Sequence, residues 1–172
     1  MRDCYAAVAL AIVLVLSTSA CTQSEPDRPP EAEFVGTWEL VSVATQWPDG
    51  RVTAPWGNEP IGRLSYGADG RMSAQLMDAR RNQADGRPLV PDFAANAASY
   101  FGAFSVDTAR RVVRHRVAAS FRAAESGTLE RAYELRDDSL ILRAEATMDD
   151  QTVTHTLVWR RGVAPLPAAD RP

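Results

Sequence analysis

Lysine is absent from this chain of 172 residues, and cysteine and histidine occur only twice each. All 19 basic residues are therefore arginines, which we attribute to genomic composition, and the net charge is −3. The chain lacks the basic excess expected of a nucleic-acid-binding protein, so we expect no nucleic-acid partner. The HExxH, GxSxG, GxGxxG and P-loop motifs are missing too, which counts against the common metalloprotease, serine hydrolase, dehydrogenase and kinase classes. We expect no metal, no cofactor and no catalytic residue set.

No apolar run is long enough for a membrane-spanning helix. The longest, residues 5–16, has twelve residues, whereas a spanning helix needs about 20. It follows Arg2 and precedes four small residues, which is typical of a secretory signal peptide over residues 1–20. Small residues directly before Cys21 resemble the bacterial lipoprotein cleavage box, in which the cysteine becomes the acylated N-terminus. The alternative is an ordinary signal peptide with Cys21 as a bystander.

Acylation of Cys21 would give the protein a lipid anchor, because each buried methylene of the acyl chains contributes about 0.8 kcal/mol. Thr22 stands where an aspartate would resemble an inner-membrane retention signal. We therefore expect a lipid-anchored protein of the bacterial cell envelope, at the outer membrane and facing the periplasm. Cys4 would leave with the signal peptide, and the mature domain would then have no cysteine for a disulfide, a thiol nucleophile or a zinc site.

Composition predicts one domain between two unstructured segments. Residues 21–33 are rich in proline and charge and are expected to form a flexible tether after the lipidated cysteine. Residues 163–172 hold three more prolines and are expected to form a disordered tail. The stretch between them, residues 34–162, has the size of a single domain. We expect a monomer.

Apolar and polar residues alternate along eight segments of this domain. The clearest pair, residues 60–66 and 69–74, is joined by a turn with Asp69-Gly70, which is typical of a β-hairpin. Along residues 34–44 the alternation places Trp38, Leu40, Ser42 and Ala44 on one face. Eight antiparallel strands with mostly short connections predict an all-β fold, an up-and-down barrel with room for side chains or one small ligand.

Two connections are long, and either can cover an opening of the barrel. Residues 45–60 contain Trp47 and Trp56. In residues 78–99, Asp92 is placed to cap one short helix that runs through Ser99. Long ordered loops often carry function.

The expected inward faces gather aromatic and polar side chains. His115 can orient a ligand carbonyl, act as an acid or base, or be a hydrogen-bonded residue of a packed interior. An inward Arg131 needs an anionic partner, either a ligand carboxylate or a glutamate such as Glu145, whereas a shift of one residue makes it a surface charge. The expected ligand-binding residues are Tyr66, Tyr100, Phe104, His115, Arg131 and Tyr133.

Several blocks follow one another along the chain: GTWELVS at residues 36–42, GNEPIG at 57–62, YGADGRMSAQ at 66–75, ASYFG at 98–102 and THTLVWRR at 154–161. Together they resemble the bacterial and fungal lipocalin-like domain family over about residues 34–161. The resemblance implies a lipocalin-like β-barrel without implying one activity.

The resemblance also implies a structural role for the first block. In lipocalins the tryptophan of a glycine-x-tryptophan block lies across the closed end of the barrel, and an arginine of the last strand packs on it. Here Trp38 would be that indole, and Arg160, or else Arg161, would supply the guanidinium. Such a cation–π contact contributes about 0.5 to 2 kcal/mol.

The leading functional interpretation is an envelope-tethered, non-enzymatic binding protein for a small hydrophobic or amphipathic ligand. The alternative is an enzyme of cyclase or isomerase type, acting on a polyketide-type or conjugated carbonyl substrate in the barrel, because relatives in polyketide pathways are thought to assist cyclisation. There, His115 and a tyrosine would form the acid/base pair. A third possibility is an interaction module whose barrel is solidly filled.

Overall fold

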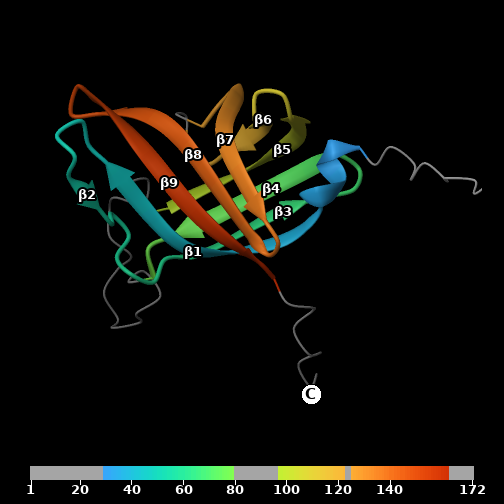
Figure 1. Cartoon of the computed structure of the whole chain (residues 1–172), viewed down its shortest axis with the longest axis horizontal. Coiled ribbons are helices and arrows are strands. Elements are labelled where there is room, and N and C mark those ends of the chain that lie inside the picture. The colour runs from blue at the N-terminus through green and yellow to red at the C-terminus, as the bar shows by residue number, and fades with distance from the viewer. Residues whose placement is uncertain (1–28, 80–96, 123–124, 163–172) are drawn as a thin grey trace, which may run out of the picture.

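A computed structural model of the chain describes residues 29–79, 97–122 and 125–162. The predicted signal peptide, Cys21 and the predicted tail lie outside these ranges. Inside them the chain forms one short 3₁₀-helix and nine β-strands (Figure 1), and none of its helical residues belong to a segment capable of spanning a bilayer. The elements are η1 (Pro30–Glu33), β1 (Gly36–Gln46), β2 (Val52–Thr53), β3 (Ile61–Tyr66), β4 (Arg71–Met77), β5 (Ala97–Asp107), β6 (Val112–Ser120), β7 (Thr128–Arg136), β8 (Ser139–Met148) and β9 (Gln151–Arg161).

Eight of the strands close into one antiparallel barrel. Their order around the ring is β1-β3-β4-β5-β6-β7-β8-β9, and β9 pairs with β1 to complete it. The two-residue strand β2 pairs only with the last residues of β1. Closure removes the free sheet edges that promote aggregation. The predicted all-β, eight-stranded up-and-down barrel is confirmed.

The hairpin predicted from residues 60–74 is formed by β3 and β4. Tyr66 pairs with Met72 at its closed end, and Gly70 in the turn has φ +77°, a left-handed conformation that glycine adopts without steric cost. The inward residues of both strands are buried, as their alternation predicts: Leu64, Tyr66, Met72, Ala74 and Leu76.

The predicted faces of β1 are wrong in its second half. The register between β1 and β9 shifts between Leu40 and Ser42. A β-bulge adds one residue to a strand, and the alternation of its side chains is inverted beyond that point. Val43 and Thr45 are therefore buried, whereas Ser42 and Ala44 are only partly covered.

The predicted helix through Ser99 is wrong in its last residues, and Asp92 lies outside the described residues. Strand β5 already begins at Ala97, because pairing with β4 outweighs the helix propensity of a few alanines. The short helix η1 falls at the end of the predicted tether. Its Glu31 accepts a hydrogen bond from the backbone N–H of Val106 at 3.1 Å, so this part of the segment packs on the barrel.

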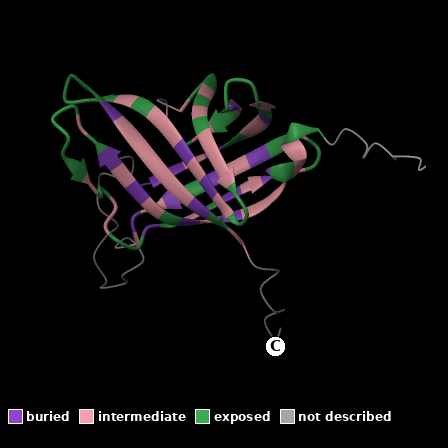
Figure 2. Cartoon of the chain, viewed as in Figure 1, coloured by how far each residue is buried: buried purple, intermediate pink, exposed green. Residues whose placement is uncertain are grey.

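The short helix η1 and the short strand β2 lie at opposite ends of the barrel (Figure 1). Large rings fill the end beside η1, which we call the closed end. The rings of Phe34 and Tyr133 meet edge to face with centroids 4.9 Å apart, and those of Tyr66 and Phe104 lie 4.4 Å apart. Each aromatic pair contributes about 0.5 to 1.5 kcal/mol beyond the burial of its area. Buried segments recur along the strands, whereas the loop tips at the end beside β2 are exposed (Figure 2). The half of the barrel beside η1 is solid core.

Trp38 lies in this core, fully buried. The guanidinium that covers it belongs to Arg161, 4.2 Å from the ring centroid, and it also donates to two backbone carbonyls of the segment before β1. The prediction of Arg160 is therefore wrong. Arg161 is the cross-strand partner of Trp38, so the two side chains share a face, whereas Arg160 pairs with Glu39 on the outer face.

Candidate functional site

The half of the barrel away from η1 is hollow. A cavity of about 370 Å³ lies between the strands, bordered by Pro55 and Trp56 from the loop between β2 and β3. Of the two tryptophans in the predicted covering connection, residues 45–60, Trp56 borders the cavity. Trp47 instead packs against the Arg51 guanidinium, which lies 4.3 Å from the ring centroid. The apolar part of the wall comprises Val43, Leu64, Ala74, Leu76, Ala98, Leu142, Ala144, Ala146, Met148 and Leu157. Four of these are alanines, whose short side chains leave the space open.

The six predicted ligand-binding residues divide between the two halves. Tyr100, His115 and Arg131 border the cavity. The other three do not: Tyr66, Phe104 and Tyr133 belong to the aromatic core at the closed end. All six face inward as predicted, but alternation alone does not tell how far along the barrel axis a side chain lies.

His115 joins the core to the cavity. Its Nε2 lies 2.7 Å from the Tyr66 hydroxyl and its Nδ1 lies 3.0 Å from the Tyr100 hydroxyl. Burial, and then the positive charge of Arg131, lowers the pKa of His115 to about 3. Burial also raises the pKa of both tyrosines, most strongly that of Tyr66. The three groups therefore form a neutral hydrogen-bonded chain near neutral pH, as expected of a histidine in a packed interior.

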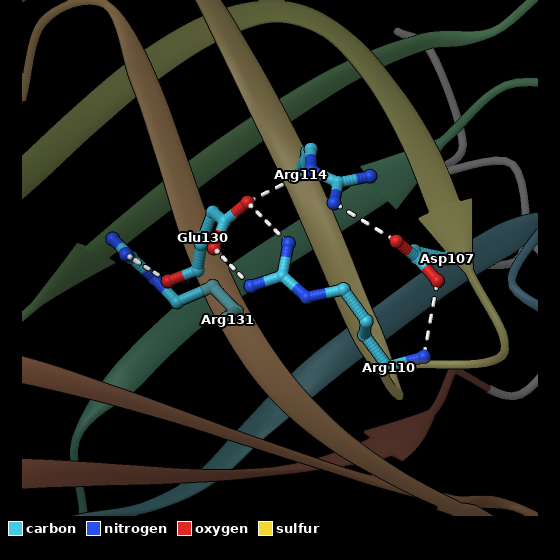
Figure 3. A network of polar contacts seen from close by, with 5 residues as sticks. All are labelled: Asp107, Arg110, Arg114, Glu130 and Arg131. Carbon is cyan, nitrogen blue, oxygen red and sulfur yellow. Dashed lines mark hydrogen bonds and ion pairs between the residues drawn. The ribbon is translucent and has the colours of Figure 1, made fainter.

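Arg131 reaches the cavity from β7. One of its Nη atoms donates to the backbone carbonyl of Glu130 at 3.0 Å (Figure 3). The Glu130 carboxylate itself bonds Arg110 and Arg114 on the outer face. Glu145, the protein partner considered from the sequence, is exposed on β8. Within the described ranges, no carboxylate lies within ion-pairing distance of Arg131.

Two further charged residues at the cavity, Arg122 and Glu125, form an ion pair with each other. Arg122 lies 3.8 Å from Glu125, and the hydroxyl of Ser120 donates to the same carboxylate at 2.9 Å. Both charged residues border the cavity. Among the described residues that border the cavity, the positive charge that remains without a carboxylate partner is therefore that of Arg131.

Two residues of β9 that the sequence analysis did not select also border the cavity. His155 bonds the hydroxyl of Thr45 through Nδ1 at 2.9 Å. Trp159 is 1% exposed, and its Nε1 has no hydrogen-bond partner in the described structure. Their inward direction follows from the regular alternation of the strand. The cavity itself could have been predicted from the alanines at inward positions of several strands, because small inward side chains leave space inside a barrel.

Nothing in the described ranges brings together three or more side chains of the types that bind metal ions. The chemistry of the site is instead that of an apolar chamber with a few hydrogen-bonding groups at one side. Ligand sites of this kind hold mostly apolar molecules and orient them by a small number of polar contacts.

A sequence model of the family described as "Lipocalin-like domain" matches residues 35–162. The chain belongs to this family. The match covers all eight strands of the barrel and the cavity between them. No curated protein matches this lipocalin-like protein.

Among solved structures, one that is similar to the lipocalin-like chain is the solution structure of a lipocalin, the product of the Q83 gene, whose expression is activated on cell transformation by the myc oncogene. The two chains are 15% identical, with 85% of this chain and 79% of the other covered at a TM-score of 0.37. The family assignment rests on the sequence model.

Proposed function

We propose that this lipocalin-like domain is a binding protein that holds a small, largely apolar molecule in its barrel without transforming it, and that a lipid on Cys21 tethers it in the cell envelope. The cavity of about 370 Å³ with mainly aliphatic walls is the observation that supports binding. Each Å² of apolar ligand surface that enters it contributes about 25 cal/mol. The same cavity counts against a solidly filled interaction module.

A cyclase or isomerase of the kind considered from the sequence finds less support in the site. A general base works best with a pKa near the working pH, and that of His115 is lowered to about 3. Both of its ring nitrogens are already bonded to tyrosine hydroxyls. These contacts suit a residue that fixes the geometry of the site.

Binding is tested with pyrene, a neutral apolar probe whose emission reports the polarity around it. We expect saturable binding to the purified protein. Ala144→Trp would place an indole in the cavity and should weaken binding at least about tenfold. Ala132→Trp is the matched control, because Ala132 is exposed on the neighbouring strand β7 and should leave binding unchanged. Circular dichroism of both variants shows whether each is folded.

Two outcomes would refute the binding proposal. One is the absence of saturable pyrene binding to the wild-type protein. The other is equal binding by the Ala144→Trp and Ala132→Trp variants in their folded state, because the probe would then bind outside the barrel. Native mass spectrometry of protein from its own host complements this test by showing a co-purifying molecule.

The tether is tested by metabolic labelling with radioactive palmitate in a bacterial host. We expect the label on the wild-type chain and on Cys4→Ser, and its loss in Cys21→Ser, since these are the two cysteines of the sequence. An unlabelled wild-type chain would contradict the lipid anchor and leave the binding proposal standing.

A further inference from the structure

The hydrogen bonds of His115 determine which hydroxyl can donate into the cavity. A neutral imidazole has one N–H and one acceptor nitrogen. Tyr66 is buried away from the cavity, and His115 Nε2 is the partner of its hydroxyl in the described structure, so its proton belongs to that bond. Nδ1 then carries the histidine proton and donates to the oxygen of Tyr100. Because Tyr100 borders the cavity, its own hydroxyl proton is left for a ligand.

Trp159, which borders the cavity, carries a second buried donor, its indole N–H. Among the described residues this N–H has no acceptor, whereas the indole N–H of Trp38 donates to the carbonyl of Phe34 at 2.8 Å. A buried donor without a partner costs about 1 to 3 kcal/mol. An indole N–H can only donate, so a ligand atom that meets it must be an acceptor.

The charge beside the cavity is positive. Arg122 and Glu125 offset each other, and Arg131 has no carboxylate partner among the described residues. Burial is the main cause that lowers the pKa of both His115 and His155, and the charge of Arg131 is the next. The field of this guanidinium therefore extends across the polar side of the chamber. A neutral ligand would leave it without a counter-ion.

We propose that the ligand is an apolar molecule with a single carboxylate, which Arg131 and Tyr100 bind at the polar side of the cavity. This inference rests on the proposed binding function and names its ligand class. The carboxylate supplies acceptor oxygens for the Tyr100 hydroxyl and the counter-charge for Arg131. Charge-assisted hydrogen bonds of this kind are about twice as strong as neutral ones. The aliphatic walls hold the rest of the molecule.

The test compares three ligands of one chain length that differ only at the head: decanoic acid, methyl decanoate and decanol. Each displaces bound pyrene from the purified protein at neutral pH. We expect the acid to bind about tenfold or more tightly than either neutral ligand, the gain that one charge-assisted contact gives. Raising the salt concentration should weaken the acid alone.

Single-residue variants test whether Arg131 and Tyr100 cause the preference for the acid. Arg131→Gln should weaken binding of the acid about tenfold more than it weakens binding of methyl decanoate, decanol or pyrene. Tyr100→Phe should cost the acid a smaller factor, because one neutral donor is lost. Arg136→Gln is the matched control: Arg136 lies on the same strand, is exposed, and pairs with Glu134 on the surface.

Three results overturn the proposal. In the first, the acid binds no more tightly than decanol to the wild-type protein while pyrene binds, which refutes the carboxylate and leaves the binding function intact. In the second, Arg131→Gln weakens all ligands alike, so that Arg131 shapes the barrel instead of selecting a charge. In the third, Arg136→Gln weakens the acid as much as Arg131→Gln does. Absence of pyrene binding is a separate failure, that of the proposed function.

Discussion

Replacing His115 by glutamine should change how the stability of the barrel depends on pH. In the folded protein, burial and the charge of Arg131 lower the pKa of His115 to about 3, whereas in the unfolded chain it lies near 6.5. Between these values the unfolded chain binds a proton that the folded protein does not, so stability falls as the pH falls. From about pH 7.5 to about pH 5, this histidine alone should lower the free energy of unfolding by about 2 kcal/mol.

The assay is urea denaturation of the wild-type protein and His115→Gln at both pH values. The variant is expected to be less stable at either pH, because it alters two hydrogen bonds, but most of the pH dependence should disappear. The carboxylates with lowered pKa, Asp107 among them, begin to lose their contribution only as the pH falls below about 5, the lower limit of this window. His155, whose pKa burial also lowers, acts in the same direction, so His155→Gln serves as the comparison. An unchanged slope in His115→Gln, or an NMR titration midpoint near 6.5 in the folded protein, would refute the reasoning.

Two further predictions concern the barrel itself. Gly102→Ala would bring a Cβ into steric conflict with the backbone carbonyl oxygen of Arg116 on β6, where the register of β5 and β6 shifts at a bulge, so it should lower the free energy of unfolding by about 1 to 3 kcal/mol, measured by urea denaturation; a neutral effect would contradict this close approach of the two strands. Arg161→Gln should cost about 1 to 3 kcal/mol in the same assay, because it loses the contact with Trp38 and two hydrogen bonds to carbonyls. Arg160→Gln, its outward neighbour, should stay within about 0.5 kcal/mol, and equal losses in the two variants would disprove the assignment.

Alternation along the strands was sufficient to predict the barrel, because a period of two specifies which side of each strand is buried. It failed in β1, where the bulge after Leu40 inverts the faces, and such an insertion leaves no mark on apolar patterning. The prediction also failed in the residues before Tyr100, where alanines are compatible with either a helix or a strand. There, pairing with the neighbouring strand β4 determines the structure.

The site was predictable in part for a related reason. Inward direction identified Tyr100, His115 and Arg131, but the depth of a residue along the barrel depends on the register of its neighbours. Tyr66 and Phe104 were therefore placed in the binding site although they belong to the core. Arg161 was likewise separable from Arg160 only by the pairing that sets it opposite Trp38.

The division of the barrel into a ring-filled half and a chamber with alanines in its wall separates two kinds of selection on the sequence. Mutations among the packed rings are expected to threaten folding, whereas exchanges among Ala74, Ala98, Ala144 and Ala146 would alter the shape of the cavity. The cavity can therefore change its shape while the packed half of the barrel keeps the fold. For protein engineers, the same four positions are the natural place to begin a library of receptors with altered selectivity.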